Sequence, residues 1–310
     1  MRVKVLGSAA GGGFPQWNCG CSNCSRVRAG VLKGRSRTQA QVAISPTGSD
    51  WILLNASPDL RQQITQDRDF APNGNGRSTP IAVIVLTSAD VDCVLGLLHL
   101  REFQPLRIYS TLSVRRVLTE ENSLFKTLER SNPPIQWEVL RINERLMIRL
   151  PRANSDKEIF LCSAISLGGD SPDYVSDPLR RSLHQEEAVV GLEIIQNEKR
   201  LFYAPGLPGR GEDWKLCLSS SDLALVDGSF WTDDELNKVH GAGKAARAMG
   251  HMPLSGTGGL LEQTKSAGRA RRVLIHLNNT NPVLDEESAA HHAVRDSGWE
   301  VAYDGMEFNL

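Results

Sequence analysis

An almost purely apolar run, residues 81–86, is the feature that most constrains the fold of this chain of 310 residues. Apolar side chains at successive positions predict a β-strand that is covered on both faces, because a strand with one exposed face alternates with polar residues. Two later apolar runs also end at a polar residue: residues 223–226 lead to Asp227, and residues 271–275 lead to His276. Buried strands with helices interspersed predict an α/β sandwich.

The remaining strands are predicted from short apolar runs bounded by turn residues. They are residues 2–6, 41–45, 51–55, 107–109, 188–195, 201–204, 299–303 and 306–310, the last two as a hairpin around Asp304-Gly305. One helix is predicted from Pro58, with Ser57 as its N-cap, and another over residues 94–102. The long polar segment 168–187 is typical of a functional lid or of a disordered stretch. Because no repeat or linker divides the chain, residues 1–310 are expected to form a single domain.

The composition is that of an ordinary globular protein, with 40% hydrophobic and 23% charged residues. The formal net charge is −1 and the basic residues are scattered, which argues against nucleic acid or an anionic membrane as a partner. The N-terminus, MRVKVLGSAAGGGFP, lacks the apolar core of a signal peptide. No stretch approaches the roughly 18 apolar residues of a membrane-spanning helix. We therefore expect a cytoplasmic protein without a membrane segment, whose role in any export would depend on a partner.

Three of the six cysteines lie close together, in the pattern Cys19-x-Cys21-x-x-Cys24. Thiolates are soft ligands that suit Zn²⁺, and short spacings let one loop supply three corners of a tetrahedron. Such a cluster in a long cytosolic chain favours a metal over a disulfide framework. The pattern predicts a structural zinc, and the alternative is three reduced thiols on a loop. The sequence does not name the fourth ligand.

A second candidate constellation, Ser88-x-Asp90-x-Asp92-Cys93, directly follows the apolar run 81–86. The carboxyl end of a buried strand is where α/β sheets hold ligands. Two carboxylates two residues apart would repel each other when buried, and a divalent metal would relieve that repulsion. The alternative is a helix N-terminus, which Asp90 and Asp92 would simply cap.

Further candidate ligands stand in two later loops. His251 lies in a glycine-rich stretch and can be a metal ligand or a general acid or base, although a lone histidine is more often a satisfied polar residue. His276 begins a loop whose amides, among them Asn278 and Asn279, can orient a substrate or satisfy their own backbone. Asp227, followed by glycine, is first of all a turn signal. If the strand ends lie on one side of the sheets, Asp90, Asp92, Asp227 and His276 would meet there.

Together these segments resemble the coenzyme PQQ synthesis protein B family of the metallo-β-lactamase superfamily. Seven stretches carry the resemblance, in one order along nearly the whole chain: LGSAAGGGFPQWNCGCSNC (6–24), LLNASPDLRQQI (53–64), DVDCVLGLLHLRE (90–102), YAPGL (203–207), VDGSFWTDDE (226–235), MGHM (249–252) and VLIHLNNTNPVLDE (273–286). The resemblance implies an αββα sandwich of two mixed β-sheets flanked by helices. It also implies a structural zinc on Cys19, Cys21 and Cys24.

The resemblance places a second metal where the superfamily has its HxHxDH motif. That motif here consists of Ser88, Asp90, Asp92 and Cys93. Both leading histidines are absent, as is usual in this family, which makes a hydrolytic dinuclear zinc centre improbable. The chain departs from the family at Cys93, where histidine is usual. A thiolate binds iron but is softer and oxidisable, so this site is either retuned or weakened.

The activity that the resemblance implies is a non-haem Fe(II)-dependent hydroxylation. Its substrate would be the tyrosine ring of a Glu–Tyr unit derived from the precursor peptide of pyrroloquinoline quinone (PQQ). The implied catalytic residues are Asp90, Asp92, His251 and His276. The implied ligands of the second metal are Asp92, Cys93 and His276, with Asp227 as a further ligand or as a residue that orients one. Asn278 and Asn279 would bind the backbone of the substrate.

Two other functions stay open. The chain can be a carrier that takes PQQ or its precursor towards the periplasm, since the amide-rich loop suits an anionic quinone. The second of these functions is a lactamase-like hydrolase, which the missing histidines disfavour. The expected partners are a small peptide or amino-acid-derived substrate and other PQQ biosynthesis proteins, and a homodimer is left open.

Overall fold

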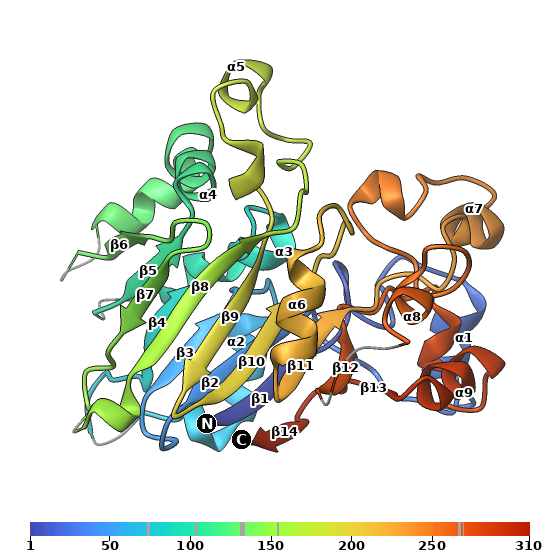
Figure 1. The fold of residues 1–310 in the computed structure, drawn as a ribbon, viewed down its shortest axis with the longest axis horizontal. Coiled ribbons are helices and arrows are strands. Elements are labelled where there is room, and N and C mark those ends of the chain that lie inside the picture. The colour runs from blue at the N-terminus through green and yellow to red at the C-terminus, as the bar shows by residue number, and fades with distance from the viewer. Residues whose placement is uncertain (73–74, 103–104, 131–133, 154, 266–267, 269) are drawn as a thin grey trace.

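Two mixed β-sheets, each of seven described strands, face each other in the computed structural model (Figure 1). The structure describes residues 1–310 except 73–74, 103–104, 131–133, 154, 266–267 and 269. In spatial order the first sheet comprises β14 (Glu307–Asn309), β1 (Arg2–Gly7), β2 (Gln41–Ser45), β3 (Trp51–Leu54), β4 (Ile81–Val85), β5 (Arg107–Ser110) and β6 (Gln136–Val139). The second comprises β13 (Trp299–Val301), β12 (Arg271–Ile275), β11 (Leu223–Asp227), β10 (Lys199–Ala204), β9 (Val190–Gln196), β8 (Phe160–Ser166) and β7 (Arg145–Ile148).

Helices cover the outer faces of both sheets. The α-helices are α1 (Ser22–Arg28), α2 (Leu60–Gln66), α3 (Val91–Val94), α4 (Leu112–Arg116), α5 (Asp177–Arg180), α6 (Asp213–Ser220), α7 (Glu235–His240), α8 (Leu260–Gln263) and α9 (Ala289–Asp296). Further helical segments of 3₁₀ or π type are η1 (Arg68–Phe70), η2 (Leu95–Leu100), η3 (Val117–Glu121), η4 (Ser123–Arg130), η5 (Asp156–Glu158), η6 (Gln185–Glu187), η7 (Arg247–Met249) and η8 (Pro282–Leu284). Among the described helices, none has the length and apolar character that a bilayer crossing requires.

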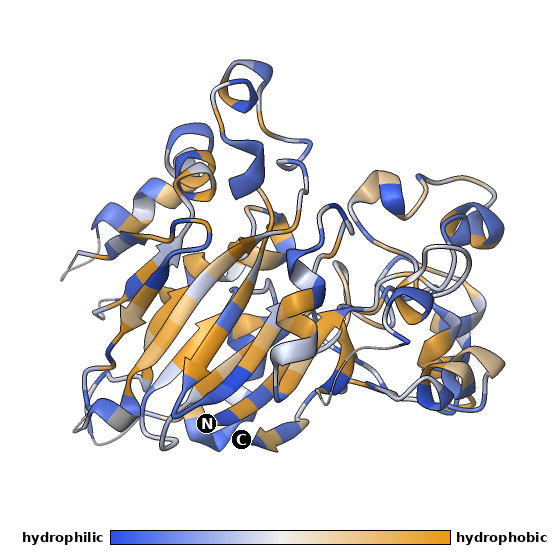
Figure 2. Cartoon of the chain, viewed as in Figure 1, coloured by the Kyte–Doolittle hydropathy of each residue, from blue (hydrophilic) through white to orange (hydrophobic). Residues whose placement is uncertain are grey.

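Three apolar layers explain why the strands are buried on both faces. Along β4, Val83 and Val85 belong to the core between the two sheets, whereas Ile84 belongs to the core between the first sheet and its helices. A third core joins the second sheet to its helices and includes Val226 of β11 and Val294 of α9. The strands are accordingly rich in hydrophobic residues, while α5 and α7 are largely hydrophilic (Figure 2). Together these layers form the expected αββα sandwich.

The parallel strands β10, β11 and β12 lie side by side, with Asp227 of β11 paired to Ile275 of β12. The ends of β11 and β12 therefore present Asp227 and His276 at the same rim of the second sheet. The parallel strands β3, β4 and β5 are arranged in the same way in the first sheet, and α3 follows β4. These are the strand ends that position the candidate site.

Two helix predictions were wrong at their boundaries. The first helix begins at Leu60, because the Ser57 hydroxyl donates to Gln63 Oε1 at 3.1 Å and does not cap the helix. The helix predicted over residues 94–102 is replaced by α3 and by the 3₁₀ turn η2. Gly96 packs there against the backbone of the strand-end loop, and its N–H donates to the Ala56 carbonyl at 2.9 Å.

The predicted C-terminal hairpin is also wrong. β13 pairs in parallel with β12 in the second sheet, whereas β14 pairs antiparallel with β1 in the first. The Asp304 carboxylate accepts hydrogen bonds from the Thr38 N–H at 2.6 Å and the Ser8 hydroxyl at 2.7 Å, which fixes the crossing between the sheets. β2 pairs antiparallel with β3, and β9 pairs antiparallel with β10.

Candidate metal centres

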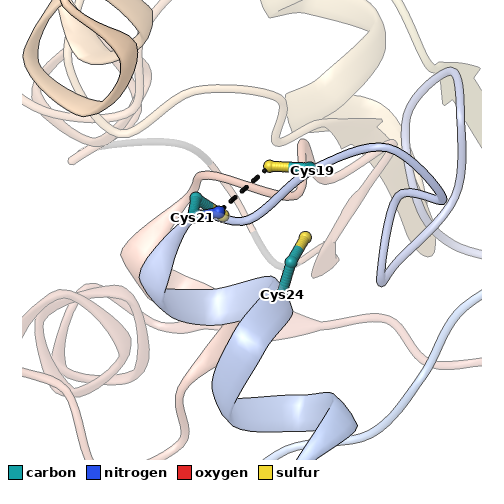
Figure 3. A group of neighbouring side chains, drawn as sticks. All are labelled: Cys19, Cys21 and Cys24. Atoms are coloured by element: carbon teal, nitrogen blue, oxygen red, sulfur yellow. Dashed lines mark hydrogen bonds between the residues drawn. The ribbon is translucent and has the colours of Figure 1, made fainter.

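The three clustered cysteines meet at the start of α1. Cys19 and Cys21 lie on the preceding loop and Cys24 lies in the helix, with the three sulfur atoms within 4.8 Å of one another (Figure 3). The Cys21 N–H donates to Cys19 Sγ at 3.4 Å. Three soft donors at this spacing fit Zn²⁺, and the cluster can hold that ion.

The loop after β12 closes the cysteine cluster. The side-chain amide of Asn279 lies 3.2 Å from Cys19 Sγ, 3.7 Å from Cys21 Sγ and 3.4 Å from Cys24 Sγ. Asn279 is buried, and Asn23 of α1 donates to its carbonyl oxygen at 3.2 Å. The structure therefore places the Asn279 side chain at the cysteines, whereas Asn278 donates to Thr280 Oγ1 at 2.6 Å.

Burial shapes the acidity of these thiols. It raises the pKa of Cys21 to about 11. For Cys19, burial acts in the same sense, but hydrogen bonds from the Cys21 backbone and from neighbouring side chains outweigh it and lower the pKa. Three uncompensated thiolates are costly in such a pocket, and a bound cation removes that cost.

A second cluster forms where the strand ends of both sheets meet. The ligand atoms of Asp227, His251 and His276 lie within 4.8 Å of one another. Asp92, at the start of α3, reaches this group from the first sheet, with its Oδ2 2.8 Å from His276 Nε2. His251 Nδ1 lies 2.7 Å from Asp227 Oδ2, and the two imidazole rings stack with their centroids 5.2 Å apart.

The cluster is partly exposed to solvent. The Asp227 side chain is 1% exposed, but those of Asp92 and His251 are 20% and 16% exposed. A metal bound here would thus be held by both buried and partly exposed side chains.

The backbone conformation of His276 directs its side chain into the site. Its φ of 62° lies in the left-handed region, which costs an ordinary residue roughly 1–2 kcal/mol. The neighbouring backbone holds it there: the Leu277 N–H donates to the Ser8 carbonyl at 3.0 Å, and the Ser229 hydroxyl contacts the His276 carbonyl at 2.9 Å. Strain that the surroundings maintain in this way is typical of functional positions.

Ser229 is a central residue of the site that the sequence analysis missed. Its hydroxyl oxygen lies 2.6 Å from Asp227 Oδ1, 2.8 Å from His276 Nδ1 and 3.1 Å from His251 Nδ1. A hydroxyl has one proton, and the Asp227 carboxylate and the His276 carbonyl both only accept, so Ser229 donates to one of these two oxygens and its own oxygen can accept from the His276 Nδ1–H. His276 Nε2 is then the atom that faces Asp92 and a metal. The available signal was the position of Ser229, two residues after the aspartate that ends β11.

Asp227 and His251 stabilise each other's charged forms. Burial acts to raise the pKa of Asp227, but the positive charge and hydrogen bond of His251 prevail and lower it. The pKa of Asp92 is likewise lowered, because the His276 hydrogen bond and the histidine charges overcome burial. Burial opposes protonation of His251, yet Asp227 raises its pKa. A divalent cation at this cluster would take the place of the His251 proton and release it.

Asp90 and Cys93 lie beside this cluster and differ from Asp92 in environment. Asp90 Oδ2 accepts from the Ser88 hydroxyl at 2.7 Å, and burial followed by the Asp92 charge raises the Asp90 pKa. The Cys93 thiol is buried at 3.3 Å from Asn55 Nδ2, and burial with the two nearby carboxylates raises its pKa well above the usual value. Among the described residues, the compact group of Asp227, His251 and His276 does not include Cys93.

The segment 168–187 folds over the loop that carries Asp90. It contains α5 and η6, and Figure 1 shows α5 projecting beyond the strands next to α4. The Tyr174 hydroxyl donates to the Ala89 carbonyl, and Lys244 pairs with Asp173 at 2.8 Å. Apolar residues of the segment, among them Val175 and Leu179, pack in the same core as Cys93.

The αββα sandwich with metal-ligand side chains at its strand ends defines a protein of the β-lactamase superfamily, and the family model described as "Beta-lactamase superfamily domain" matches residues 50–277. Within that superfamily the chain belongs to the coenzyme PQQ synthesis protein B family. It is 42% identical to coenzyme PQQ synthesis protein B of Nitrosococcus oceani and 40% identical to that of Methylococcus capsulatus, over 100% of each chain.

Solved structures agree with this assignment. The crystal structure of Zn²⁺-bound PqqB from Methylobacterium extorquens is 37% identical and superposes with a TM-score of 0.90, covering 100% of both chains. A diphosphatase of the PhnP family is 16% identical with a TM-score of 0.66, and it shares the fold alone.

Proposed function

We propose that this PQQ biosynthesis protein is an Fe(II)-dependent hydroxylase of the tyrosine ring in a Glu–Tyr unit derived from the precursor peptide. The observation that carries the proposal is the meeting of two imidazoles with the carboxylates of Asp92 and Asp227 at a partly exposed rim. Two histidines and one carboxylate with open positions are the ligand set of non-haem Fe(II) oxygenases. The donor set of this site therefore fits iron.

His276 and Asp92 would hold the iron, and His251 would join them through Nε2, because its Nδ1 is engaged by Asp227. Asp227 and Ser229 would orient the two imidazoles. Iron would supply the activation of O₂. Asp90, whose pKa is raised by burial and by Asp92, is the candidate for carrying a proton next to the metal.

The overall reaction inserts one oxygen atom of O₂ into a ring C–H bond and releases the other as water. Two electrons and two protons must come from an external two-electron reductant. Asn278 is half-buried in the loop that also carries His276. It is our candidate for binding the substrate backbone. The cysteine cluster would hold a structural Zn²⁺ and take no part in the reaction.

The test is anaerobic loading with Fe(II), followed by Glu–Tyr, a reductant and isotopically heavy O₂. We expect a ring-hydroxylated product that carries one heavy oxygen atom, and no product from His276→Ala. A folded, iron-loaded chain that gives no product would contradict the proposal. Tight binding of PQQ that persists after metal removal would favour the carrier function instead.

A further inference from the structure

We infer that Lys244 and Arg210 bind the carboxylate groups of the substrate. Each cation does so by exchanging an aspartate of the segment 168–187 for a carboxylate of Glu–Tyr. The inference rests on the proposed function, which supplies the anionic substrate, and it names the side chains that would recognise the negative charges of that substrate.

The segment 168–187 brings an aspartate to the first-sheet side of the second metal centre. The segment connects β8 to β9 of the second sheet. Its Tyr174 hydroxyl donates to the carbonyl of Ala89, the residue before Asp90. Asp173, which precedes Tyr174, therefore lies near the Asp90 side of the centre.

Lys244 stands on the loop that carries His251. Within this loop the His251 N–H donates to the Ala246 carbonyl at 3.0 Å, so the backbone that follows Lys244 positions the imidazole. Lys244 Nζ lies 2.8 Å from Asp173 Oδ2. This ion pair therefore joins the His251 side of the second centre to the Asp90 side.

Arg210 makes a second contact of the same kind. Its loop follows β10, and the Leu207 N–H of that loop donates to Asp227 Oδ2 at 2.9 Å. Arg210 Nη1 lies 3.5 Å from Asp170 Oδ2 and donates to the Gly168 carbonyl at 3.1 Å. Each cation thus stands on a loop that also holds a candidate ligand of the metal, and each faces an aspartate of the same segment.

Both ion pairs suit exchange with an anionic substrate. Their four side chains are between 58% and 89% exposed. Exposed ion pairs contribute little to stability, so opening them costs the fold little. A substrate carboxylate that replaces an aspartate restores the same pairing at the cation. A Glu–Tyr dipeptide has two carboxylates, on the glutamate side chain and at the C-terminus, and these match the two cations.

The segment itself can keep its conformation during the exchange. Arg180 donates to the carbonyls of Ser171 and Pro172, each at 2.8 Å, and to that of Val175 at 3.1 Å. These bonds fix the backbone around Asp173 from within the segment and engage the Arg180 guanidinium. Exchange then requires only that the exposed aspartate side chains turn away from the two cations.

The test measures binding of Glu–Tyr to the Fe(II)-loaded chain by anaerobic isothermal titration calorimetry. We expect Lys244→Ala and Arg210→Ala each to weaken binding by about tenfold, since each removes a bond to a charged group. Asp173→Asn should tighten binding, because the competing carboxylate is gone. Lys238→Ala is the matched control, since Lys238 is an equally exposed lysine of α7 that pairs with Asp234 at 2.8 Å, and it should leave binding unchanged.

Two uncharged analogues, Gln–Tyr and the C-terminal amide of Glu–Tyr, test whether the effect depends on carboxylates. Each analogue should bind more weakly to the wild-type chain, and with each analogue one of the two alanine variants should lose its effect. Equal losses for Glu–Tyr and for both analogues would overturn the inference, because they would indicate a general disturbance of the loops. Metal analysis of each variant verifies that iron is still bound.

Binding and turnover separate this inference from the proposed hydroxylase. Binding that depends on Lys244 and Arg210, without any hydroxylated product, would support the carboxylate site and contradict the hydroxylase. Product formation with the same KM for Glu–Tyr in both alanine variants and the wild type would overturn the inference alone. An iron-loaded wild-type chain that does not bind Glu–Tyr would overturn both.

Discussion

His276 Nε2 lies 2.8 Å from Asp92 Oδ2, although 184 residues separate them along the chain. Asp92 follows β4 of the first sheet and His276 follows β12 of the second. Their contact exists only when the two sheets pack against each other. The same pair is the most direct point at which to test the second metal centre.

We expect Asp92→Asn and His276→Ala to abolish Fe(II) binding at the second centre and to leave zinc at the cysteines. Each change removes one candidate metal ligand and also breaks its contact with a second ligand of the site. Metal analysis of each variant after loading with both ions measures the outcome. Loss of both metals from a folded Asp92→Asn chain would show that the two centres are not separable.

Ser229→Ala is expected to weaken Fe(II) binding by about 10–100-fold, the usual effect of removing a group that orients a metal ligand. The hydroxyl holds His276 Nδ1 and Asp227 Oδ1 together, and alanine leaves both without that bond. Ser221→Ala is a suitable control, since Ser221 is also buried and its hydroxyl donates to the Cys217 carbonyl at 2.7 Å. Equal iron affinity in Ser229→Ala and in the wild type would exclude the orienting role.

Cys93→Ala is expected to keep Fe(II) affinity within a few-fold of the wild type. The Cys93 sulfur contacts Asn55 and Thr87 and stands outside the compact ligand group of the described residues. Cys93→His should tighten iron binding, because imidazole reaches further than a thiol and is a good ligand for iron. Cys162→Ala, a buried cysteine in β8, controls for loss of core volume. Loss of iron binding in the Cys93→Ala variant would indicate that the Cys93 thiol is a metal ligand.

The buried carboxyl group of Glu235 is expected to make the stability of the fold depend on pH. Its carboxylate accepts from Thr280 Oγ1 and the Trp231 N–H, each at 2.6 Å, and burial raises its pKa from 4.5 to about 7. The folded state therefore retains a proton that the unfolded chain releases from pH 4.5 upward. Stability should fall between pH 4.5 and 7 and level off above, by up to about 3 kcal/mol.

In the Glu235→Gln variant this part of the pH dependence should disappear, because the amide does not titrate. The free energy of unfolding in urea at several pH values, compared between variant and wild type, measures the difference. Parallel curves for the two proteins from pH 4.5 to 8 would contradict the raised pKa.

Tyr174→Phe is expected to speed amide hydrogen exchange in the segment 168–187. The change removes the hydrogen bond to the Ala89 carbonyl, worth about 1 kcal/mol, which anchors the segment beside Asp90. Lys244→Ala is the comparison, since the exposed pair with Asp173 should contribute little to stability and be screened by salt. Exchange that responds to the Lys244 change alone would assign the anchoring to the surface pair.

The sequence predicted most strands because burial of alternate residues in two different cores leaves a direct trace in the pattern. In β4, Val83 and Ile84 face different apolar layers, so every position is apolar. The C-terminal hairpin was predicted wrongly because the local pattern there fits two different structures. An Asp-Gly turn between two short strands is compatible with a hairpin or with a crossing, and the contacts of Asp304 with Ser8 and Thr38 select the crossing.

The apolar strands, the polar residues that follow them and the closely spaced thiols could be read from the sequence, because these features depend on neighbours in the chain. Which side chains meet depends on the packing of the folded chain. It brought Asp92 of one sheet to His276 of the other, placed Ser229 between two imidazoles and turned Asn279 towards the sulfurs. Such contacts depend on how the sheets pack and on backbone angles such as the left-handed φ of His276, which local sequence pattern does not specify.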